Sequence, residues 1–308
     1  MVVSGLSGSF RVPTFARSRV RRPSPIPYRE NMEQSRVHGF AVVAGAAGGI
    51  GMEVAFTLAS AGARGILFGD TNYDGVANAA RESKSLASNP TYQALSVKLN
   101  VTDPSSVKAM MDLAVKEFGR IDYFVNAVGV DVAEYVPFEE TADDDYDRVL
   151  EINAKGSYLL SKAAVKVMKD QEPLQVHLGR HGIRDVGRGA IVHVCSAMAV
   201  GAVPWKAPYV ASKHAMLGLT RACAMDCKPY DIRVNQVCPA WTKTPMYEED
   251  CRRSPLTPQV VERLAARKRP MEAYEVAASC LYLCSPGAVS ITGTSIMMDC
   301  GVTIGPVL

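Results

Sequence analysis

A cluster of glycines between an apolar segment and a helical pattern is the strongest constraint on the fold of this 308-residue chain. Residues 40–51 read FAVVAGAAGGIG, an apolar run followed by a turn that contains four glycines. An apolar run of this length predicts a buried strand, and the segment after the turn has a helical pattern. Glycines let a backbone approach a pyrophosphate closely, and the free N–H groups at a helix N-terminus bind its charge. The segment therefore predicts a strand–turn–helix unit that binds a dinucleotide.

Short apolar segments and helical segments alternate through the rest of the chain. The expected strands are 40–43, 65–68, 94–101, 121–126, 190–195, 232–237 and 295–298, and the expected helices are 51–61, 73–88, 105–118, 146–169, 209–227 and 272–284. Alternation of strand and helix with tight turns is typical of a parallel sheet. We therefore expect an α/β fold: a single Rossmann-type, doubly wound parallel sheet with helices on both faces.

An acidic residue follows the glycine turn at the spacing of a dinucleotide site. Asp70 closes the second expected strand, nineteen residues after Gly51. A carboxylate there accepts hydrogen bonds from the adenosine ribose hydroxyls and repels a 2′-phosphate. Arg64 and Arg81 could offset that repulsion, but the glycine turn has no basic residue. The sequence therefore predicts a preference for NAD(H), with NADP(H) as the alternative.

Tyr209 and Lys213 stand four residues apart in an expected helix, so they share one face of it. A neighbouring cation lowers the pKa of a phenol, which suits Tyr209 to act as a general acid or base. This spacing is common by chance, so the context decides. Ser196 ends the strand thirteen residues before Tyr209, and its hydroxyl could hold a substrate oxygen.

Several motifs resemble the classical short-chain dehydrogenase/reductase family over residues 37–301. Residues 44–51 are similar to its Thr-Gly-x-x-x-Gly-x-Gly motif, with Ala in place of Thr. Residues 126–129, Asn-Ala-Val-Gly, resemble its Asn-Asn-Ala-Gly signature, and residues 299–301 resemble its closing Asp-Gly-Gly. The extra Gly48 also fits the extended branch of the family, whereas the other motifs and the short C-terminal part favour the classical branch.

The resemblance implies a role for each site residue. Tyr209 would transfer the proton, Ser196 would hold the substrate oxygen, and Lys213 would bind the cofactor ribose and tune Tyr209. Asn153 would support a water chain that supplies protons to Lys213. The cofactor-binding residues expected on this basis are Gly45, Gly49, Ile50, Gly51, Asp70, Asn100, Val101, Asn126, Gly129, Tyr209, Lys213, Thr242 and Thr244.

These residues predict an NAD(P)-dependent short-chain alcohol dehydrogenase or ketoreductase. Hydride would pass between the nicotinamide and a secondary alcohol or ketone, with tyrosine as the general acid or base. The alternative is a catalytically silent, nucleotide-binding scaffold or regulator of the same fold, which a damaged set of catalytic residues would favour. The resemblance also implies a homo-oligomer, a dimer or a tetramer.

The segment 245–270 is expected to cover the substrate as a lid. The family has a mobile lid at this place, and residues 259–268 have the apolar period of an amphipathic helix. A plain surface helix is the alternative. Trp205 lies between Ser196 and Tyr209 in the sequence and is expected near the mouth of the pocket. An apolar inner face of the lid implies a small-molecule substrate with an apolar body.

The N-terminal residues 1–37 are expected to lie outside the Rossmann-fold catalytic domain, 38–308. They contain seven Arg and two Glu, so the net charge of +3 divides into about +5 there and −2 elsewhere. An Arg-rich, acid-poor start is typical of a mitochondrial presequence, but Pro23, Pro25 and Pro27 disfavour a long amphipathic helix. The expectation is a disordered or targeting extension, or a start at Met32, on a protein of the cytoplasm unless the segment directs it to mitochondria.

Composition excludes several other classes of protein. No uncharged run of about 18 apolar residues occurs, so no membrane span is expected. Basic residues concentrate in the N-terminal segment, so the sequence predicts no nucleic-acid partner. Six of the eight cysteines lie in apolar runs without a CxxC spacing, which favours buried reduced thiols and no metal. Residues 171–188 look like a surface insertion.

Overall fold

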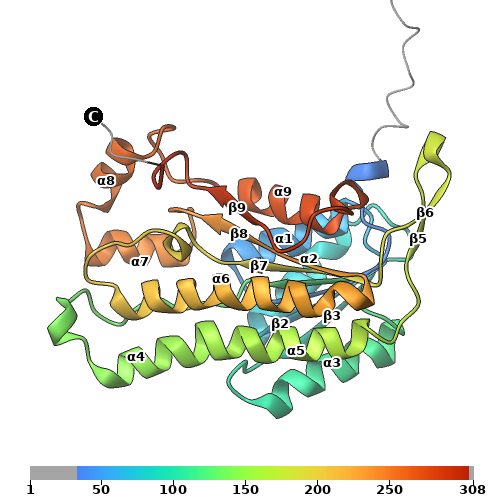
Figure 1. Cartoon of the computed structure of the whole chain (residues 1–308), viewed down its shortest axis with the longest axis horizontal. Helices are drawn as coiled ribbons and strands as arrows, with labels where there is room; N and C mark the ends of the chain where they lie inside the picture. The colour runs from blue at the N-terminus through green and yellow to red at the C-terminus, as the bar shows by residue number, and fades with distance from the viewer. Residues whose placement is uncertain (1–32, 305–308) are drawn as a thin grey trace, which may run out of the picture.

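The alternating strands form one seven-stranded parallel sheet in the order β3-β2-β1-β4-β7-β8-β9 (Figure 1). The structure is a computed structural model that describes residues 33–304. The strands are β1 (Phe40–Ala44), β2 (Gly65–Asp70), β3 (Gln93–Lys98), β4 (Tyr123–Asn126), β7 (Gly189–Val194), β8 (Ile232–Pro239) and β9 (Ser295–Met298). The expected strands are all present, with bounds shifted by a few residues, and the predicted doubly wound α/β fold is confirmed.

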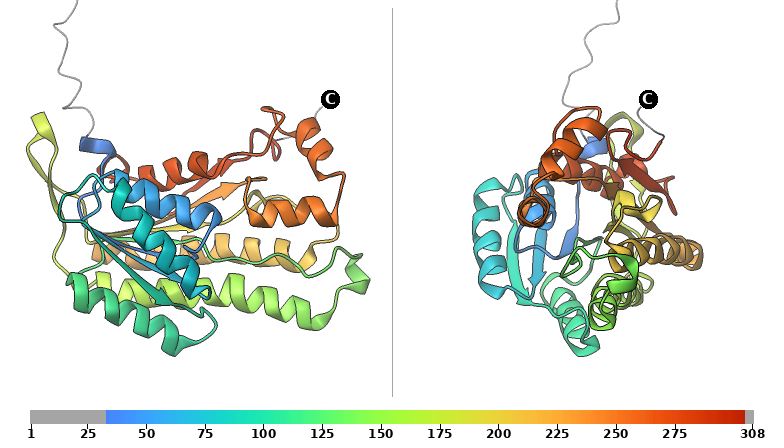
Figure 2. Two further views of the ribbon diagram at one scale, coloured as in Figure 1. Left: turned by 180° about the vertical axis from the view of Figure 1, so that it is seen from behind. Right: turned by 90° about the vertical axis from the view of Figure 1, so that its left-hand side faces the viewer.

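Helices cover both faces of the sheet, as Figure 2 shows from behind and along its edge. One face carries α1 (Gly49–Ser60), α2 (Tyr73–Leu86) and α9 (Ala273–Cys284). The other carries α3 (Pro104–Phe118), α5 (Ser157–Met168) and α6 (Ala207–Cys227). Both faces of the sheet are therefore buried, which explains why the strands read as continuous apolar runs.

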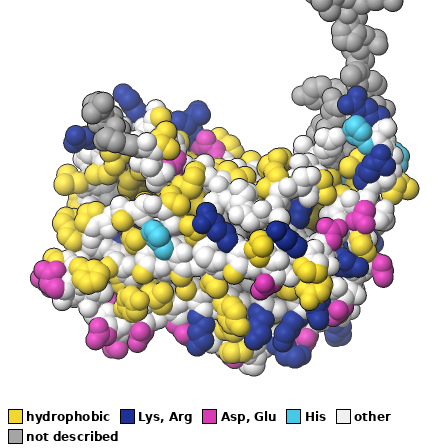
Figure 3. All heavy atoms as spheres, in the orientation of Figure 1, with side chains coloured by type: hydrophobic (Ala, Val, Ile, Leu, Met, Phe, Trp, Pro, Cys, Tyr) yellow, Lys and Arg dark blue, Asp and Glu magenta, His cyan; other side chains and the backbone are white. Residues whose placement is uncertain are grey.

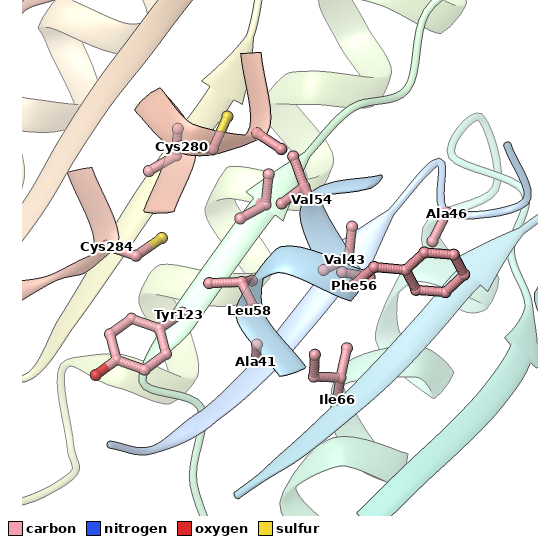
Figure 4. Packing of buried hydrophobic residues seen from close by; sticks show 14 of the residues in the cluster. Ala41, Val43, Ala46, Val54, Phe56, Leu58, Ile66, Tyr123, Cys280 and Cys284 are labelled. Atoms are coloured by element: carbon pink, nitrogen blue, oxygen red, sulfur yellow. The ribbon is translucent and has the colours of Figure 1, made fainter. Parts of the chain in front are cut away.

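On the first face, the core packs α1 and α9 against β1, β2 and β4 (Figure 4). Val54 and Leu58 of α1 lie between β1 and α9, and Cys280 and Cys284 of α9 fill the same layer. Of the six cysteines predicted to be buried, five are buried and Cys223 is half-buried, and the described cysteines are free thiols.

The long helix expected over residues 146–169 is present and contains a π-helical turn. It consists of α4 (Asp143–Leu150), a π-helical turn over Glu151–Gly156 and then α5. The π turn lets the side chain of Asn153 bind the backbone of Val130, and it brings Gly156 against Val101. A side chain at Gly156 would place its Cβ 2.7 Å from Val101. The predicted long helix is confirmed, and the π turn within it is the part that the sequence pattern did not predict.

The insertion at residues 171–188 forms a separate antiparallel hairpin. Its strands are β5 (Gln175–His177) and β6 (Ile183–Asp185), and they project beside the end of the sheet where β7 begins (Figure 1). The other expected helix that differs is 259–268. It appears as α8 (Thr257–Leu264), preceded by α7 (Pro245–Arg253), and the backbone leaves the helix before the positive φ of Lys268.

Residues 1–32 of the predicted N-terminal extension lie outside the described residues. Within 33–37, a short helical turn covers Glu33–Ser35, and Val37 is buried with its N–H bonded to the carbonyl of Ala61 at 3.2 Å. The packed body thus includes Val37. Over residues 33–304, no helix is both long and apolar enough to cross a membrane.

Candidate active site

The turn after β1 closes against the turn after β4, at the carboxyl ends of the strands where the chain order of the sheet reverses. The N–H of Ala127 donates to the carbonyl of Ala44 at 2.8 Å. Gly45 has φ +82°, and a Cβ there would lie 2.7 Å from the carbonyl carbon of Ala127. A Cβ on Gly51 would lie 2.0 Å from the carbonyl oxygen of Gly45. Only glycine permits this closed turn, and parallel sheets bind ligands at this switch point.

A cleft of about 500 Å³ opens beside this turn. Helix α1 starts there at Gly49, with no side-chain cap and no acidic residue in its first turn. Its first N–H groups are therefore available to an anion. The predicted cofactor-binding residues that line the cleft are Gly45, Gly49, Ile50, Gly51, Asp70, Asn100, Val101, Gly129 and Thr244.

Asp70 stands at the end of β2 on the rim of this cleft. Its Oδ2 accepts the N–H of Ala47 in the glycine turn at 3.2 Å, and its Oδ1 accepts the N–H of Asn72 at 3.0 Å. The two arginines that could have offset its charge are occupied elsewhere. Arg64 stacks over the ring of Phe40 at 4.9 Å, and Arg81 donates to the side chain of Asn78.

A second cavity, of about 330 Å³, adjoins the cleft and shares Gly129, Val194 and Thr244 with it. Ser196, Tyr209, Lys213, Thr242 and Thr244 all line this cavity. The structure thus brings together three of the four predicted catalytic residues beside the nucleotide cleft. Ser196 follows β7, whereas the other two lie in the first turns of α6.

The geometry of Tyr209 suits proton transfer. Tyr209 and Ser196 line the same cavity, and the ammonium of Lys213 lies 5.4 Å from the centre of the Tyr209 ring. Removal from bulk water raises the pKa of Tyr209 above 10, and Lys213 and Ser196 lower it only in part. The expectation that the cation would dominate was wrong, because burial outweighs the nearby charge. The phenol is accordingly protonated at neutral pH.

Asn153, the fourth predicted catalytic residue, lines neither the cleft nor the second cavity. Its Oδ1 accepts the N–H of Val130 at 2.8 Å, and its Nδ2 donates to the carbonyl of Val130 at 2.9 Å and to Ser212 Oγ at 3.0 Å. A Cβ on Gly129 would lie 3.3 Å from Lys213 Nζ and 3.6 Å from Asn153 Oδ1. Asn153 therefore ties the loop after β4 to the helix that carries Lys213.

Asn126, expected to bind the cofactor, is fully buried and lines neither cavity. Its Oδ1 accepts the N–H of Val128, and its Nδ2 lies 2.9 Å from Ser157 Oγ and 3.4 Å from Nδ1 of His193. Its contacts fix the loop that forms the wall shared by the two cavities. Burial, and to a lesser extent Lys213, lowers the pKa of His193 to about 4. Sequence reasoning missed His193, which reads as an ordinary strand residue.

Sequence reasoning also missed a charged cluster in the second cavity, formed by Asp131, Tyr135, Lys206 and Asp250. Lys206 Nζ lies 2.7 Å from Asp131 Oδ2 and 2.6 Å from Asp250 Oδ1. The hydroxyl of Tyr135 contacts both carboxylates. We call this group the ionic cluster. A position three residues before Tyr209 was the only sequence signal for Lys206.

Trp205 precedes the ionic cluster and lines the cavity with 57% of its surface exposed, as expected for its mouth. Its φ of +65° is rare for a bulky residue and marks a strained turn. The turn directs the next residue, Lys206, into the cavity.

Comparisons with known proteins identify the family of this chain. A family model described as enoyl-(acyl carrier protein) reductase matches residues 45–303. Short-chain dehydrogenase anuF of Penicillium roqueforti is 38% identical over 270 residues, which are 87% of this chain and 97% of that protein. D-beta-hydroxybutyrate dehydrogenase of Rhizobium meliloti is 31% identical, over 85% of this chain and 98% of its own length.

A solved structure extends the agreement to the fold. The crystal structure of levodione reductase aligns with a TM-score of 0.76 at 26% identity, over 89% of this chain and 99% of that chain. The matched model, the relatives and the parallel sheet together show that this chain belongs to the short-chain dehydrogenase/reductase family of NAD(P)-dependent oxidoreductases.

Proposed function

We propose that this enzyme transfers a hydride between a nicotinamide cofactor and a secondary alcohol or ketone, with Tyr209 as the general acid or base. The observation that carries the proposal is the position of the Tyr209 phenol. It lines the same cavity as Ser196, it lies beside Lys213, and that cavity adjoins the nucleotide cleft.

The residues of the cleft fit a dinucleotide. Gly45 and Gly51 leave a cradle that a Cβ would fill, and the start of α1 presents free N–H groups for a pyrophosphate. Thr242 and Thr244 line the cavity next to Tyr209, where they would hold the nicotinamide end. When bound, the cofactor supplies or accepts the hydride.

The side chains of the chain itself handle the proton. In reduction, the protonated phenol of Tyr209 donates to the carbonyl oxygen, and the Ser196 hydroxyl holds that oxygen in place. Lys213 stabilises the phenolate that remains, because its ammonium lies against the ring. Asn153 positions this lysine through the loop after β4 and Ser212. Oxidation of an alcohol runs the same steps in reverse.

Asp70 supports a preference for NAD(H) over NADP(H). Its carboxylate lies at the rim of the cleft, and Arg64 and Arg81 make their contacts elsewhere. A 2′-phosphate would therefore meet the negative charge of Asp70, and neither Arg64 nor Arg81 would compensate it.

The segment 245–270 fits the role of a substrate lid. Met246 and Tyr247 of α7 and Val260 of α8 line the cavity, next to Trp205 and Trp241. This lining favours a substrate with an apolar body. Levodione reductase and D-beta-hydroxybutyrate dehydrogenase act, by their names, on levodione and hydroxybutyrate, which supports a ketone or secondary alcohol here.

A homo-oligomer is also part of the proposal. Helices α4, α5 and α6 lie side by side on one face, and Figure 3 shows hydrophobic side chains exposed among charged ones over that face. Tyr146, Tyr158 and Met225 of these helices are each 45% exposed or more. Light scattering after gel filtration tests this part, and a monomer at micromolar concentration would contradict it.

The experiment for the main proposal is spectrophotometric. NADH and NADPH oxidation are followed with a panel of uncharged ketones, and cofactor affinity is measured separately by calorimetry. Turnover that Tyr209→Phe abolishes is the expected result. Tight cofactor binding with no turnover over a broad panel would instead support the silent scaffold.

A further inference from the structure

The ionic cluster is the polar part of an otherwise largely apolar substrate cavity. It joins three separate elements: Asp131 and Tyr135 from the loop after β4, Lys206 from the turn before α6, and Asp250 from the lid helix α7. The charged side chains are between 12% and 17% exposed, so they are well shielded from water. Lys206 Nζ lies 5.9 Å from the ring centre of Tyr209, so the cluster is within reach of a small substrate held there.

One ammonium faces two carboxylates in the cluster, and Lys206 is bonded to both of them. Burial and the neighbouring charge of Asp131 raise the pKa of Asp250 to about 7, so the second carboxylate is ionised, and the cluster has a net negative charge, only above that pH. Of the described residues that line the cavity, only Lys206 and Lys213 are cationic, and Lys213 lies against Tyr209. The nearby Arg253 is also engaged, because it donates to the carbonyl of Val132 and pairs with Glu249. A substrate carboxylate would therefore find no unpaired cation on this wall.

The cluster does offer an acceptor. Both contacts to Asp250 end on Oδ1, and no donor from the described residues reaches its Oδ2. Once Asp250 is ionised, above a pH of about 7, a hydroxyl group of a ligand can donate to this oxygen, and hydrogen bonds to an ionised carboxylate are strong. A ligand carboxylate would instead be repelled by the net negative charge that two carboxylates and one ammonium then leave on this wall.

We propose that Asp131 and Asp250, bridged by Lys206, form a specificity subsite that selects uncharged ketones bearing a hydroxyl donor and excludes keto acids. The inference rests on the proposed hydride transfer, because it defines the far end of the same substrate. Selection of this kind combines an attractive contact for one class with a repulsive contact against the other.

The test compares substrates that share one reacting ketone. Acetoacetate and benzoylformate are keto acids, and their methyl esters replace the charge by an added methyl group. In the wild type at pH 8.5, where Asp250 is ionised, kcat/KM should favour each ester by about tenfold or more. In a second pair, 4-hydroxy-2-butanone and 4-methoxy-2-butanone, a methyl group replaces the hydrogen of the hydroxyl donor. The hydroxyl compound should be favoured by about fivefold.

The double variant Asp131→Asn/Asp250→Asn keeps the shape of both side chains and removes both charges. It leaves the charge of Lys206 unpaired, so the preference for each ester should fall by about tenfold or more. The control variant Asp112→Asn/Asp226→Asn removes the same number of charges from exposed positions outside the cavity, and it should keep the wild-type ratio. Melting temperatures report folding, and Asp250→Asn alone replaces the double variant if that variant fails to fold.

Binding is measured in parallel, so that this subsite and the hydride transfer are tested separately. Calorimetric titration of the NAD⁺-saturated protein with each ketone gives dissociation constants without turnover. Absence of turnover with every ketone would count against the hydride transfer, whereas the binding ratios would still decide the subsite. A wild type that prefers keto acids, or a ratio unchanged in the charge-free variant, would overturn the proposal.

Discussion

The nucleotide cleft and the substrate cavity share a wall, but they are built in different ways. The cleft is formed mainly by backbone, with a closed glycine turn, the start of α1 and one carboxylate at the rim. The cavity is formed by side chains from several elements, among them the ionic cluster and helices α7 and α8. A backbone site tolerates changes of side chain but not added bulk, whereas a side-chain site changes its ligand when its residues change.

The largest effect should come from the catalytic end of the cavity. Tyr209→Phe removes the proton donor, so kcat should fall by about a thousandfold or more. The Kd of NAD(H) should change by no more than a few-fold, because the phenol is not part of the glycine turn. Tyr274→Phe, an exposed tyrosine on α9, serves as the control. Retention of most of the wild-type kcat would remove Tyr209 from the mechanism.

The second largest effect should come from adding a side chain to the glycine turn of the nucleotide cleft. A Cβ on Gly51 would lie 2.0 Å from the carbonyl oxygen of Gly45, whereas one on Gly48 meets no atom within 4 Å. Gly51→Ala should therefore weaken NAD(H) binding by about a hundredfold and lower the melting temperature. Gly48→Ala, three residues away in the same turn, should leave both nearly unchanged. Equal affinities of the two variants for NADH in calorimetry would contradict the account of the turn.

The stability of the fold should depend on pH through His193, which is buried next to Asn126 behind the loop between the two cavities. His193 has a pKa of about 4 in the folded protein, whereas an unfolded histidine titrates near 6.5. Between these values the unfolded chain binds the proton and the folded one does not, so stability falls as the pH falls. Urea unfolding should show this one group costing about 2 kcal/mol between pH 7 and pH 5.

His193→Gln should remove that part of the pH dependence. His177→Gln, on the exposed strand β5, should keep it. If both variants unfold with the same pH dependence as the wild type, His193 is not held neutral in the folded protein.

The smallest effect concerns the rim of the cleft. Asp70→Ser removes the charge that meets a 2′-phosphate, so the ratio of kcat/KM for NADH over NADPH should fall by about tenfold. Asp74→Ser, in the first turn of α2, removes a charge nearby without touching the glycine turn and should change the ratio less. A wild type that already favours NADPH tenfold would show that Asp70 does not select the cofactor.

Local spacing explains what could be predicted from the sequence. The glycine turn, Asp70 and the pair Tyr209 and Lys213 each lie within one strand–turn–helix unit or one helix face. Their geometry therefore follows from regular secondary structure. The parallel, doubly wound character of the sheet followed from the alternation of strands and helices, whereas the order of the strands was not predicted.

The ionic cluster could not be predicted in this way. Asp131, Lys206 and Asp250 come from three segments that are distant in the sequence and meet only in the tertiary structure. The direction of the pKa shift of Tyr209 could not be predicted from the sequence either, because burial raises this pKa more than the charge of Lys213 lowers it. Each of these depends on tertiary packing, on which a spacing carries no information.

The π turn has a consequence for how this chain can vary in length. A π turn closes its hydrogen bonds from residue i to i+5, so it holds one residue more than the α-helical turn that would replace it. Deleting one residue from 151–156 should therefore convert the turn to a regular α-helix and leave the buried Val149 and Leu160 on nearly the same faces. The loss would fall on the contacts that the turn provides, those of Asn153 with Val130 and of Gly156 with Val101. The helix can thus lose a residue here without being rotated, but not without giving up the position of Asn153.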